Sequence, residues 1–294
     1  MAHQLFRGPS RLWTTNGCGS PYPRHVGTVA AFFDLDKTVL ARSSGLAFTR
    51  HFYRGGLLGR ADVIRSAYTQ FVFSLAGADE KQTENMRRYL SALVTGWDVD
   101  TVKRIVGETL DQVIDPIVHA EAVELIQQHK AAGHDVVIIS ASGTEVVEPI
   151  GQRLGVDVTV GTTMDVVDGK FSGSISHYAH GAQKAAAMQR LAEERGYDLS
   201  QCFAYSDSST DIPMLEAVGH PHAVNPDATL RKLAVAKKWP ILEFKRPVAM
   251  PRRIPKVDAK AGAALVGSAV VIGAVWFAYH AIARRRVTAT SASQ

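Results

Sequence analysis

Cysteine is almost absent from this chain. Only Cys18 and Cys202 occur among its 294 residues, and they lie far apart in the sequence. Two distant cysteines give neither the disulfide framework of a small secreted domain nor the close ligand spacing of a zinc site, so a reducing compartment is expected. The hydrophobic content is 46%, enough at this length for a full apolar core, which excludes a disordered or fibrous protein.

A basic globular body is also lacking, although the formal net charge of the whole chain is +5. Residues 1–27 carry three arginines and no acid (+3), and residues 245–294 carry nine basic residues against one aspartate (+8). The remaining residues, 28–244, therefore sum to −6. Because the basic charge belongs to the ends, nucleic acid is not an expected partner.

The first 27 residues contain no apolar run of signal-peptide length. Their glycine, proline, serine and asparagine content indicates a flexible leader without a functional site. Their arginines leave a transit peptide as an open alternative.

Two carboxylates follow the first apolar run of the body. Residues 30–33 read as a strand that is buried on both faces of a parallel sheet, and Asp34 and Asp36 come directly after it. Ligands bind at this end of the strands in open α/β sheets. Of two acids at this spacing, one can attack an electrophile or bind a cation while the other donates and accepts protons. A loop with Asx-turn hydrogen bonds is the alternative interpretation.

A second β-branched run, residues 135–139, ends at Ser140. If this strand lies beside the first, Ser140 and nearby backbone N–H groups come close to Asp34. Hydroxyl and amide donors suit an anion such as phosphate. The alternative is a serine-rich turn that caps a helix from Thr144.

Lys184 lies at the start of an amphipathic helix over residues 185–195. A lysine at this end opposes the helix macrodipole, and a bound anion would relieve the conflict. An ordinary surface lysine is the alternative. Before this helix, residues 156–176 are predicted as strands joined by a hairpin turn at Asp168-Gly169.

A third apolar run, residues 202–205, is followed by Asp207 and, four residues later, Asp211. With Asp34, these acids would meet at one edge of the sheet. Crowded carboxylates repel one another unless a hard divalent cation neutralises them, so the pattern predicts magnesium. The alternative is that either aspartate only caps the next helix.

The residues between the first and second strands change in character. Four segments within residues 43–114 place apolar residues at helical spacing, with glycines between the segments and Asp98 or Asp100 as a possible cap of the last helix. No strand pattern interrupts them. We therefore expect an inserted helical module over residues 43–114.

Taken together, these motifs resemble those of the haloacid dehalogenase (HAD) superfamily, within it the phosphoserine-phosphatase-like subfamily IB. The resemblance covers residues 28–244. It implies an α/β fold, a Rossmann-like parallel sheet with helices on both faces. The core domain would comprise residues 28–42 and 115–244, and residues 43–114 would form the helical cap.

The resemblance also implies roles for individual side chains. Asp34 is expected to be the nucleophile that forms an aspartyl phosphate, and Asp36 the general acid and base. Ser140 and Lys184 would bind the phosphoryl oxygens, with Lys184 also restraining Asp34.

The expected cofactor is Mg²⁺. The resemblance implies that Asp34, the main-chain carbonyl of Asp36, and Asp207 bind the ion. Asp211 would support the site by orienting Asp207 or a metal-bound water. Anionic attack on phosphate requires such positive charge.

The implied function is a Mg²⁺-dependent phosphomonoester hydrolase (a phosphatase). Phosphoserine phosphatases carry a glutamate nine residues after the nucleophile, whereas Ser43 stands there in this chain, so free phosphoserine is not the expected substrate. Phosphoserine phosphatase activity and a phosphotransferase with the same intermediate remain alternatives. A noncatalytic membrane-tethered adaptor is less favoured, because it needs none of the four motifs.

The C-terminal region contains an uncharged run of 23 residues, 261–283, followed by three arginines. As a helix it would span about 34 Å, enough to cross a hydrocarbon core. A surface-docked or buried helix is the alternative. We expect a basic, proline-containing linker over residues 245–260, a transmembrane helix over residues 261–283, and a basic and polar tail over residues 284–294.

The charges around this run favour one orientation. Six basic residues lie before it and three after it, which keeps the catalytic domain on the cytoplasmic side of a single-pass membrane protein. A membrane and a phosphorylated small-molecule or lipid-type substrate are the expected partners.

Overall fold

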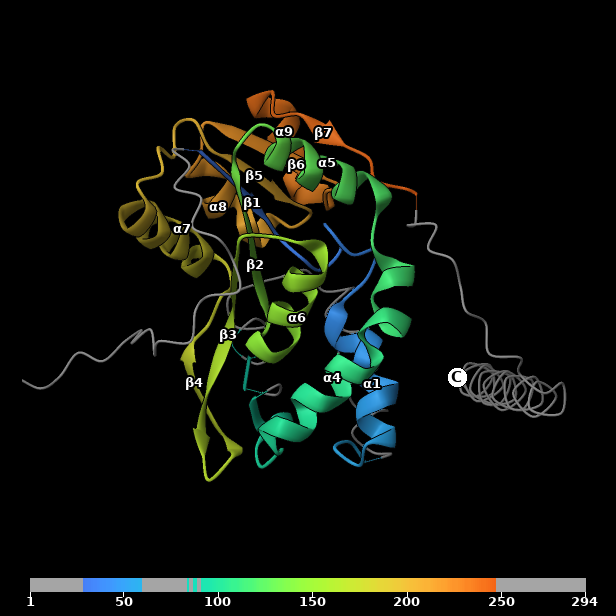
Figure 1. Cartoon of the computed structure of the whole chain (residues 1–294). Helices are drawn as coiled ribbons and strands as arrows, with labels where there is room; N and C mark the ends of the chain where they lie inside the picture. Colours follow the sequence, from blue (N-terminus) through green and yellow to red (C-terminus); the bar gives the residue numbers. More distant parts are fainter. Residues whose placement is uncertain (1–28, 60–83, 85–86, 89–90, 247–294) are drawn as a thin grey trace, which may run out of the picture. The chain divides into compact units, whose positions relative to one another are not determined.

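The structure, a computed structural model, describes residues 29–59, 84, 87–88 and 91–246 (Figure 1). The predicted leader, the predicted hydrophobic helix 261–283, the tail 284–294 and all but the first two residues of the linker lie outside these ranges. Nothing in the described part of the chain supports the C-terminal hydrophobic helix. No helix in that part is both long and apolar enough to cross a membrane.

A seven-stranded sheet, counted over the described residues, forms the centre of the fold. Its order is β4-β3-β2-β1-β5-β6-β7, and all neighbours are parallel except β3 and β4. The α/β sheet of mostly parallel strands agrees with the sequence prediction. The strands are β1 (Ala30–Phe33), β2 (Asp135–Gly143), β3 (Val158–Val167), β4 (Lys170–His177), β5 (Phe203–Ser206), β6 (His220–Val224) and β7 (Ile241–Leu242).

The first strand is apolar on both faces, as its place in the middle of the sheet requires. All four of its residues are buried. It pairs with β2 on one side, where Phe33 lies opposite Ile138, and with β5 on the other, where Phe33 lies opposite Tyr205. The three strands that precede the predicted site residues are therefore adjacent, and their carboxyl ends meet at one edge.

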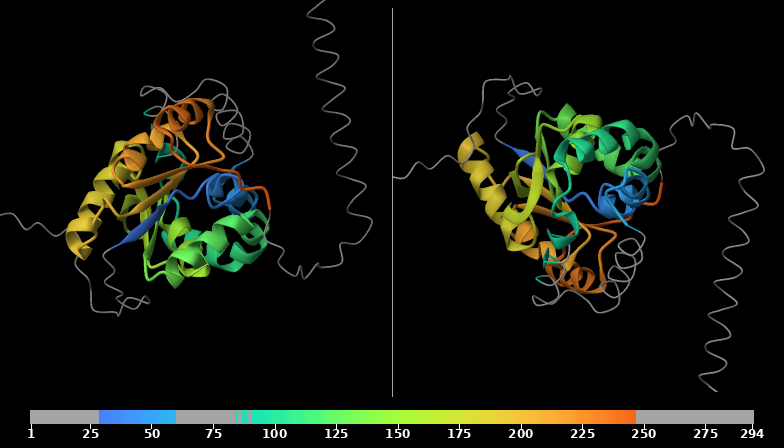
Figure 2. Two further views of the ribbon diagram at one scale, coloured as in Figure 1. Left: turned by 90° about the horizontal axis from the view of Figure 1, so that it is seen from above. Right: turned by 90° about the horizontal axis from the view of Figure 1, so that it is seen from below.

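Helices cover both faces of the sheet (Figures 1 and 2). Alternate residues of β1 enter different cores: Phe33 packs in a cluster with α4, α5 and α6, and Phe32 packs in a second cluster with α7, α8 and α9. This is the period of two expected of a strand. The helices are α1 (Ser44–Arg54), α4 (Val99–Val113), α5 (Ala120–Ala131), α6 (Thr144–Leu154), α7 (Ala182–Arg195), α8 (Ile212–Glu216) and α9 (Ala228–Lys237), with short 3₁₀ turns η1 (Asp115–Ile117) and η2 (Ser209–Asp211).

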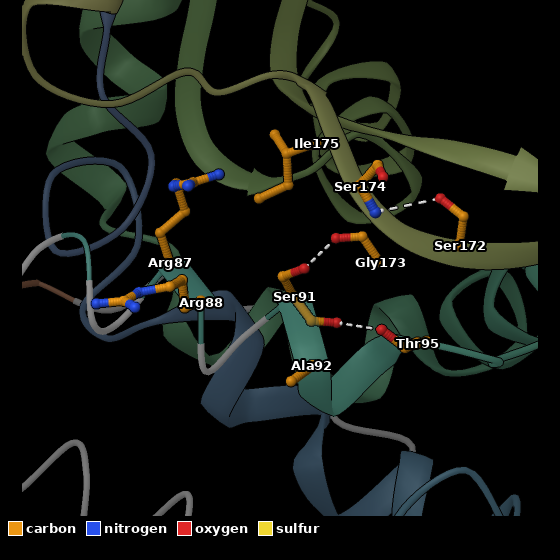
Figure 3. Close-up of a pocket in the computed structure, with 9 residues that line it drawn as sticks. All are labelled: Arg87, Arg88, Ser91, Ala92, Thr95, Ser172, Gly173, Ser174 and Ile175. Atoms are coloured by element: carbon orange, nitrogen blue, oxygen red, sulfur yellow. Dashed lines mark hydrogen bonds between the residues drawn. The ribbon is translucent and has the colours of Figure 1, made fainter.

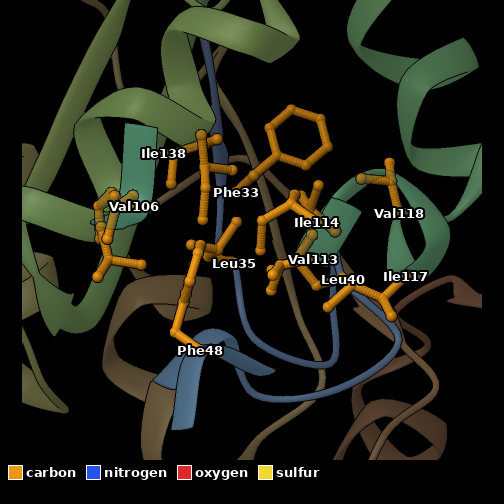
Figure 4. Packing of buried hydrophobic residues seen from close by; sticks show 14 of the residues in the cluster. Phe33, Leu35, Leu40, Phe48, Val106, Val113, Ile114, Ile117, Val118 and Ile138 are labelled. Atoms are coloured by element: carbon orange, nitrogen blue, oxygen red, sulfur yellow. The ribbon is translucent and has the colours of Figure 1, made fainter. Parts of the chain in front are cut away.

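Two helices of the predicted cap, α1 and α4, lie within the described residues. Asp98 caps α4 by accepting a hydrogen bond from the Thr101 N–H at 2.7 Å. Phe48 of α1 and Val106 of α4 belong to the same buried cluster as Phe33 of β1 (Figure 4). The described cap helices are therefore joined to the sheet by a continuous apolar core. Residues 60–83 lie outside the described part of the chain, so the four-helix module and its domain boundaries stay predictions.

The predicted hairpin is present between β3 and β4. Asp168 and Gly169 form its turn, with φ values of 49° and 75°. Both lie in the left-handed region that the favoured two-residue hairpin turns require. This antiparallel pair extends the edge of the sheet beside the cap helices (Figure 1).

Candidate active site

One buried lysine joins two of the predicted site residues. Lys184, in the first turn of α7, places its Nζ 2.5 Å from Asp34 Oδ1 and 2.7 Å from Asp211 Oδ2. All three residues are buried, with Lys184 only 3% exposed. The ammonium therefore bridges the end of β1 to the segment after β5. Its position at a helix start, which looked unfavourable in the sequence, is compensated by these two carboxylates.

The pKa shifts at this bridge follow from burial and charge. Burial raises the pKa of Asp34 to about 7, although the charge of Lys184 acts in the opposite direction. Burial alone would lower the pKa of Lys184, but Asp211 and then Asp34 outweigh it and raise that pKa. The lysine thus remains charged and restrains Asp34.

Asp207 follows β5 and lies near Asp34. Burial, and next the negative charge of Asp34, raise the pKa of Asp207 to about 8. The Thr38 hydroxyl donates a long hydrogen bond, 3.4 Å, to Asp207 Oδ1. Because the buried Asp34 raises the pKa of the half-buried Asp207 by its negative charge, this site favours a bound cation.

Asp211 has a different set of contacts from those expected. Besides Lys184, its Oδ2 accepts a hydrogen bond from the Ser206 hydroxyl at 2.7 Å. Its buried Oδ1 has no hydrogen-bond partner among the described residues. The expected role of Asp211 toward Asp207 or a metal-bound water therefore stays a prediction.

The carboxylate of Asp36 is held at both oxygens. Oδ1 accepts from the Ser44 N–H at 2.7 Å, and Oδ2 accepts from the Ser142 hydroxyl at 2.9 Å. Ser44 begins α1, whereas Ser142 lies near the end of β2. Neither serine is predicted as a site residue from the sequence. The only signal was that Ser142 follows Ser140 by two residues in the same small, hydroxyl-rich end of a strand.

Ser140 is buried within β2, two residues beyond Ile138, the partner of Phe33. Its hydroxyl accepts a hydrogen bond from the Ser142 N–H at 3.2 Å. The structure thus brings Ser140 to the same edge of the sheet as Asp34. Its phosphate-binding role stays a prediction.

The oxygen donors at this edge match the preference of Mg²⁺. Asp34 and Asp207 have carboxylates there, and the main-chain carbonyl of Asp36 is the third expected ligand. Across the described residues, no group of three or more His, Cys, Asp or Glu side chains is arranged to hold a metal. Two carboxylates and one carbonyl still suit Mg²⁺, because this ion usually keeps several waters. The buried Oδ1 of Asp211, which has no hydrogen-bond partner in the described part of the chain, is available to accept a hydrogen bond from such a water.

A cavity of about 630 Å³ separates the cap from the β3–β4 hairpin. Figure 3 shows arginine and hydroxyl side chains around it. Ser91 contributes from the cap side, and its hydroxyl donates to the Gly173 carbonyl of β4. The lining residues are Arg87, Arg88, Ser91, Ala92, Thr95, Ser172, Gly173, Ser174 and Ile175.

Tyr178 and His180 each interact electrostatically with a charged residue named above. Burial raises the pKa of Tyr178, and the charge of Arg87 opposes that rise. The Tyr178 ring stacks on His180, with centroids 5.4 Å apart. Burial lowers the pKa of His180, and the charge of Asp211 opposes that change.

A comparison with known protein families matches residues 31–216, more than half of the chain, to the haloacid dehalogenase-like hydrolases. The chain is 56% identical over 256 residues to the inhibition of morphological differentiation protein of Streptomyces azureus, covering 85% of this chain and 92% of the relative. It is 51% identical to a "probable phosphatase" of Mycobacterium tuberculosis, covering 88% and 91%. It is 36% identical to a phosphoserine phosphatase of the same species, covering 88% and 81%.

Solved structures show the same fold. The chain matches the crystal structure of a protein of unknown function from Bordetella pertussis with a TM-score of 0.64 and 26% identity, covering 72% of this chain and 97% of that one. It matches a phosphoserine phosphatase carrying a phospho-aspartyl intermediate analogue with a TM-score of 0.55 and 20% identity, covering 75% and 95%. At this lower identity the likeness concerns the fold alone.

Proposed function

We propose that this chain hydrolyses phosphomonoesters through an aspartyl phosphate on Asp34. The chain belongs to the haloacid dehalogenase-like hydrolase family and is a phosphatase-type hydrolase. The observation that carries this proposal is the buried bridge from Lys184 to Asp34 and Asp211. A nucleophilic carboxylate needs a fixed orientation and nearby positive charge to approach an anionic phosphate. The bridge supplies both.

In the first step, a carboxylate oxygen of Asp34 attacks the phosphorus atom. The bond between phosphorus and the alcohol oxygen breaks, and Asp36 gives that oxygen its proton. The alcohol leaves, and the phosphoryl group remains on Asp34. Lys184 holds Asp34 in place and offsets the negative charge of the phosphoryl oxygens.

In the second step, a water molecule attacks the same phosphorus atom. Asp36, now a carboxylate, takes a proton from this water. The bond between phosphorus and the Asp34 oxygen breaks, which releases inorganic phosphate and restores both aspartates. Ser140 of β2 is proposed to donate a hydrogen bond to a phosphoryl oxygen.

The proposed cofactor is Mg²⁺, held by the carboxylates of Asp34 and Asp207 and the main-chain carbonyl of Asp36. When bound, the ion would offset the charge that gathers between nucleophile and phosphate. The negative charge of the buried Asp34, which raises the pKa of the half-buried Asp207, supports this assignment.

The test is phosphate release by Asp34→Asn, measured with and without Mg²⁺. The variant keeps the size of the side chain but removes the nucleophilic oxygen, and we expect no Mg²⁺-dependent release above background. Asp168→Asn, in the exposed hairpin turn, is the matched control and should keep full activity. Unchanged turnover in Asp34→Asn would refute the mechanism.

The proposed substrate is a phosphomonoester other than free phosphoserine. Ser43 precedes α1 as its N-cap residue, so no carboxylate stands at that position to bind an amino group. The cavity of about 630 Å³ between cap and hairpin is of the size that binds small-molecule ligands. If phosphoserine were turned over as efficiently as the best member of a phosphometabolite panel, this substrate proposal would be wrong.

Other assignments remain to be tested beside this one. Phosphoserine phosphatase activity is favoured by the name of the 36% identical relative. A phosphotransferase would pass the phosphoryl group from Asp34 to an alcohol, and product analysis with added acceptor alcohols distinguishes it from a hydrolase. A noncatalytic adaptor would release no phosphate from any member of the panel.

We also propose that residues 261–283 anchor the chain in a membrane with the catalytic domain cytoplasmic, facing a lipid-type or other phosphorylated substrate. The support is the uncharged run and its flanking basic residues. Deletion of residues 259–294 should release the protein from membranes. Recovery of the intact chain in the soluble fraction would contradict the anchor.

A further inference from the structure

We propose that Ser142 and Ser44 are positioning residues that aim the carboxylate of Asp36 at the leaving-group oxygen. This inference rests on the proposed function, because it assumes that Asp36 is the general acid and base. It assigns to the cap helix α1 a direct part in orienting that group.

The geometry that carries this inference is a closed set of three contacts. The Ser44 N–H lies 2.7 Å from Asp36 Oδ1, and the Ser142 hydroxyl lies 2.9 Å from Asp36 Oδ2. The two serine hydroxyls are themselves 2.9 Å apart. Each carboxylate oxygen thus has its own donor, which fixes the rotation of the carboxylate about its terminal bond.

The donors come from separate parts of the fold. Asp36 lies in the loop after β1, Ser142 lies near the end of β2, and Ser44 is the first residue of α1. Ser44 is fully buried, and its N–H belongs to a helix N-terminus with no acidic residue in the first turn. A free N–H at that end favours a carboxylate partner. The orientation of Asp36 therefore depends on the seating of a cap helix against the sheet.

The contact between the serine hydroxyls has a chemical consequence. A hydroxyl carries one proton, so Ser142 can donate to Asp36 only if it accepts from Ser44 or leaves that contact unused. With Ser142 donating to Asp36, Ser44 donates to Ser142. Ser44 then orients Asp36 in two ways: its N–H donates to the carboxylate directly, and its hydroxyl orients the Ser142 hydroxyl that donates to the same carboxylate.

Proton donation matters most when the leaving group is a poor one. An alkoxide leaving group needs the proton of Asp36, whereas a nitrophenolate leaves readily without it. A mispositioned Asp36 should therefore slow alkyl phosphates much more than aryl phosphates. Damage to the fold, or to Asp34 and Lys184, would slow both classes together.

The test compares Ser142→Ala, Ser142→Thr and wild type on an alkyl phosphate and on p-nitrophenyl phosphate. In Ser142→Ala we expect kcat on the alkyl phosphate to fall roughly tenfold, as for loss of a hydrogen bond to a charged group. On the aryl phosphate we expect a change below about threefold, with KM little altered on both. Ser142→Thr keeps the hydroxyl and should restore most of the alkyl rate.

A double-mutant cycle with Asp36→Asn completes the test. If Ser142 acts through Asp36, adding Ser142→Ala to Asp36→Asn causes no further loss on the alkyl phosphate. Ser200→Ala is the matched control, because the exposed Ser200 hydroxyl also donates to an aspartate, Asp198, at 2.6 Å. Ser200→Ala should leave both rates unchanged.

Equal losses on both substrate classes, or an additive loss in the double variant, would overturn the positioning role. Those results would leave the proposed function standing, provided that Asp34→Asn abolishes phosphate release. Continued release by Asp34→Asn would instead overturn the proposed function itself.

Discussion

The ammonium of Lys184 contacts the carboxylate of Asp34 at 2.5 Å across 150 residues of sequence. Both groups are buried, and Asp211 is the second partner of the same ammonium. A single cation thus compensates two carboxylates where water is largely excluded. Removal of one partner in such a cluster leaves an uncompensated buried charge.

Replacement of Lys184 by methionine should therefore affect both activity and stability. We expect kcat to fall by about 10²-fold or more, since the charge that faces the phosphoryl group is lost. The free energy of unfolding should fall by about 3–5 kcal/mol. Lys232→Met, in the exposed part of α9, is the control in both kinetics and denaturant unfolding. Wild-type turnover in a folded Lys184→Met protein would contradict the assigned role.

Mg²⁺ should stabilise the wild-type protein and lose this effect in Asp207→Asn. The ion binds only the folded arrangement of Asp34 and Asp207, so it raises Tm with concentration. In the absence of Mg²⁺, Asp207→Asn should be at least as stable as wild type, because the variant removes repulsion between the half-buried Asp207 and the buried Asp34. Thermal unfolding over a Mg²⁺ titration measures both effects. An equal Mg²⁺-dependent rise of Tm in variant and wild type would exclude Asp207 as a ligand.

Arg87 should affect substrate binding and leave the chemical step unchanged. It lines the cavity between cap and hairpin and pairs with Glu84 at 2.7 Å on the partly exposed rim. In Arg87→Ala we expect KM for the preferred substrate of the panel to rise roughly fivefold, the effect of one lost polar contact, with kcat nearly constant. The control is Arg104→Ala, which removes an exposed guanidinium that pairs with Glu108 on α4. A fall in kcat with constant KM would contradict a role of Arg87 in substrate binding.

The stability of the fold should decrease as the pH falls from about 6.5 to about 4, in part because of His129. Burial, and next the rings of His134 and His222, lower the pKa of His129 from 6.5 to about 4. Its Nε2 lies 2.8 Å from the Tyr205 hydroxyl. In that pH range His129 is protonated in the unfolded chain but stays neutral in the folded chain. The free energy of unfolding is therefore about 1–3 kcal/mol lower near pH 4 than above pH 6.5.

His129→Gln removes this titration and isolates its contribution from that of the carboxylates. Denaturant unfolding of variant and wild type at several pH values gives the difference in free energy between them. We expect wild type to be the more stable at pH 7 and the difference to shrink as the pH falls. A difference that stays constant from pH 7 to pH 4 would show that His129 does not contribute.

The sheet and the meeting of the acids could be predicted because they depend on local patterns. Short apolar runs ahead of Asp34, Ser140 and Asp207 predict buried parallel strands, and such strands end at one edge. The structure confirms that β1, β2 and β5 are neighbours. Lys184 at the start of α7 also agrees with the predicted helix.

The contacts within the site could not be predicted in the same way. The hydrogen bonds to the Asp36 carboxylate depend on the distance between the first turn of α1 and the last residues of β2. The periodicity of apolar residues in the sequence does not predict that distance. Likewise, nothing in the sequence assigns Asp211 to Lys184 and Ser206, because this choice depends on side-chain rotamers in a buried cluster. Capping rules indicated Asp98 as one of two caps for α4, and the structure identifies it.

The central claim is that the phosphoryl group of the substrate is transferred to Asp34, and acid-quenched labelling tests it most directly. The enzyme is mixed with a ³²P-labelled phosphomonoester and Mg²⁺, quenched in acid within one turnover, and digested for mass spectrometry. The account predicts label on the peptide that contains Asp34, none in Asp34→Asn, and loss of the label with hydroxylamine, which cleaves acyl phosphates. Phosphate release without any label on this peptide, or label on a different residue, would contradict it.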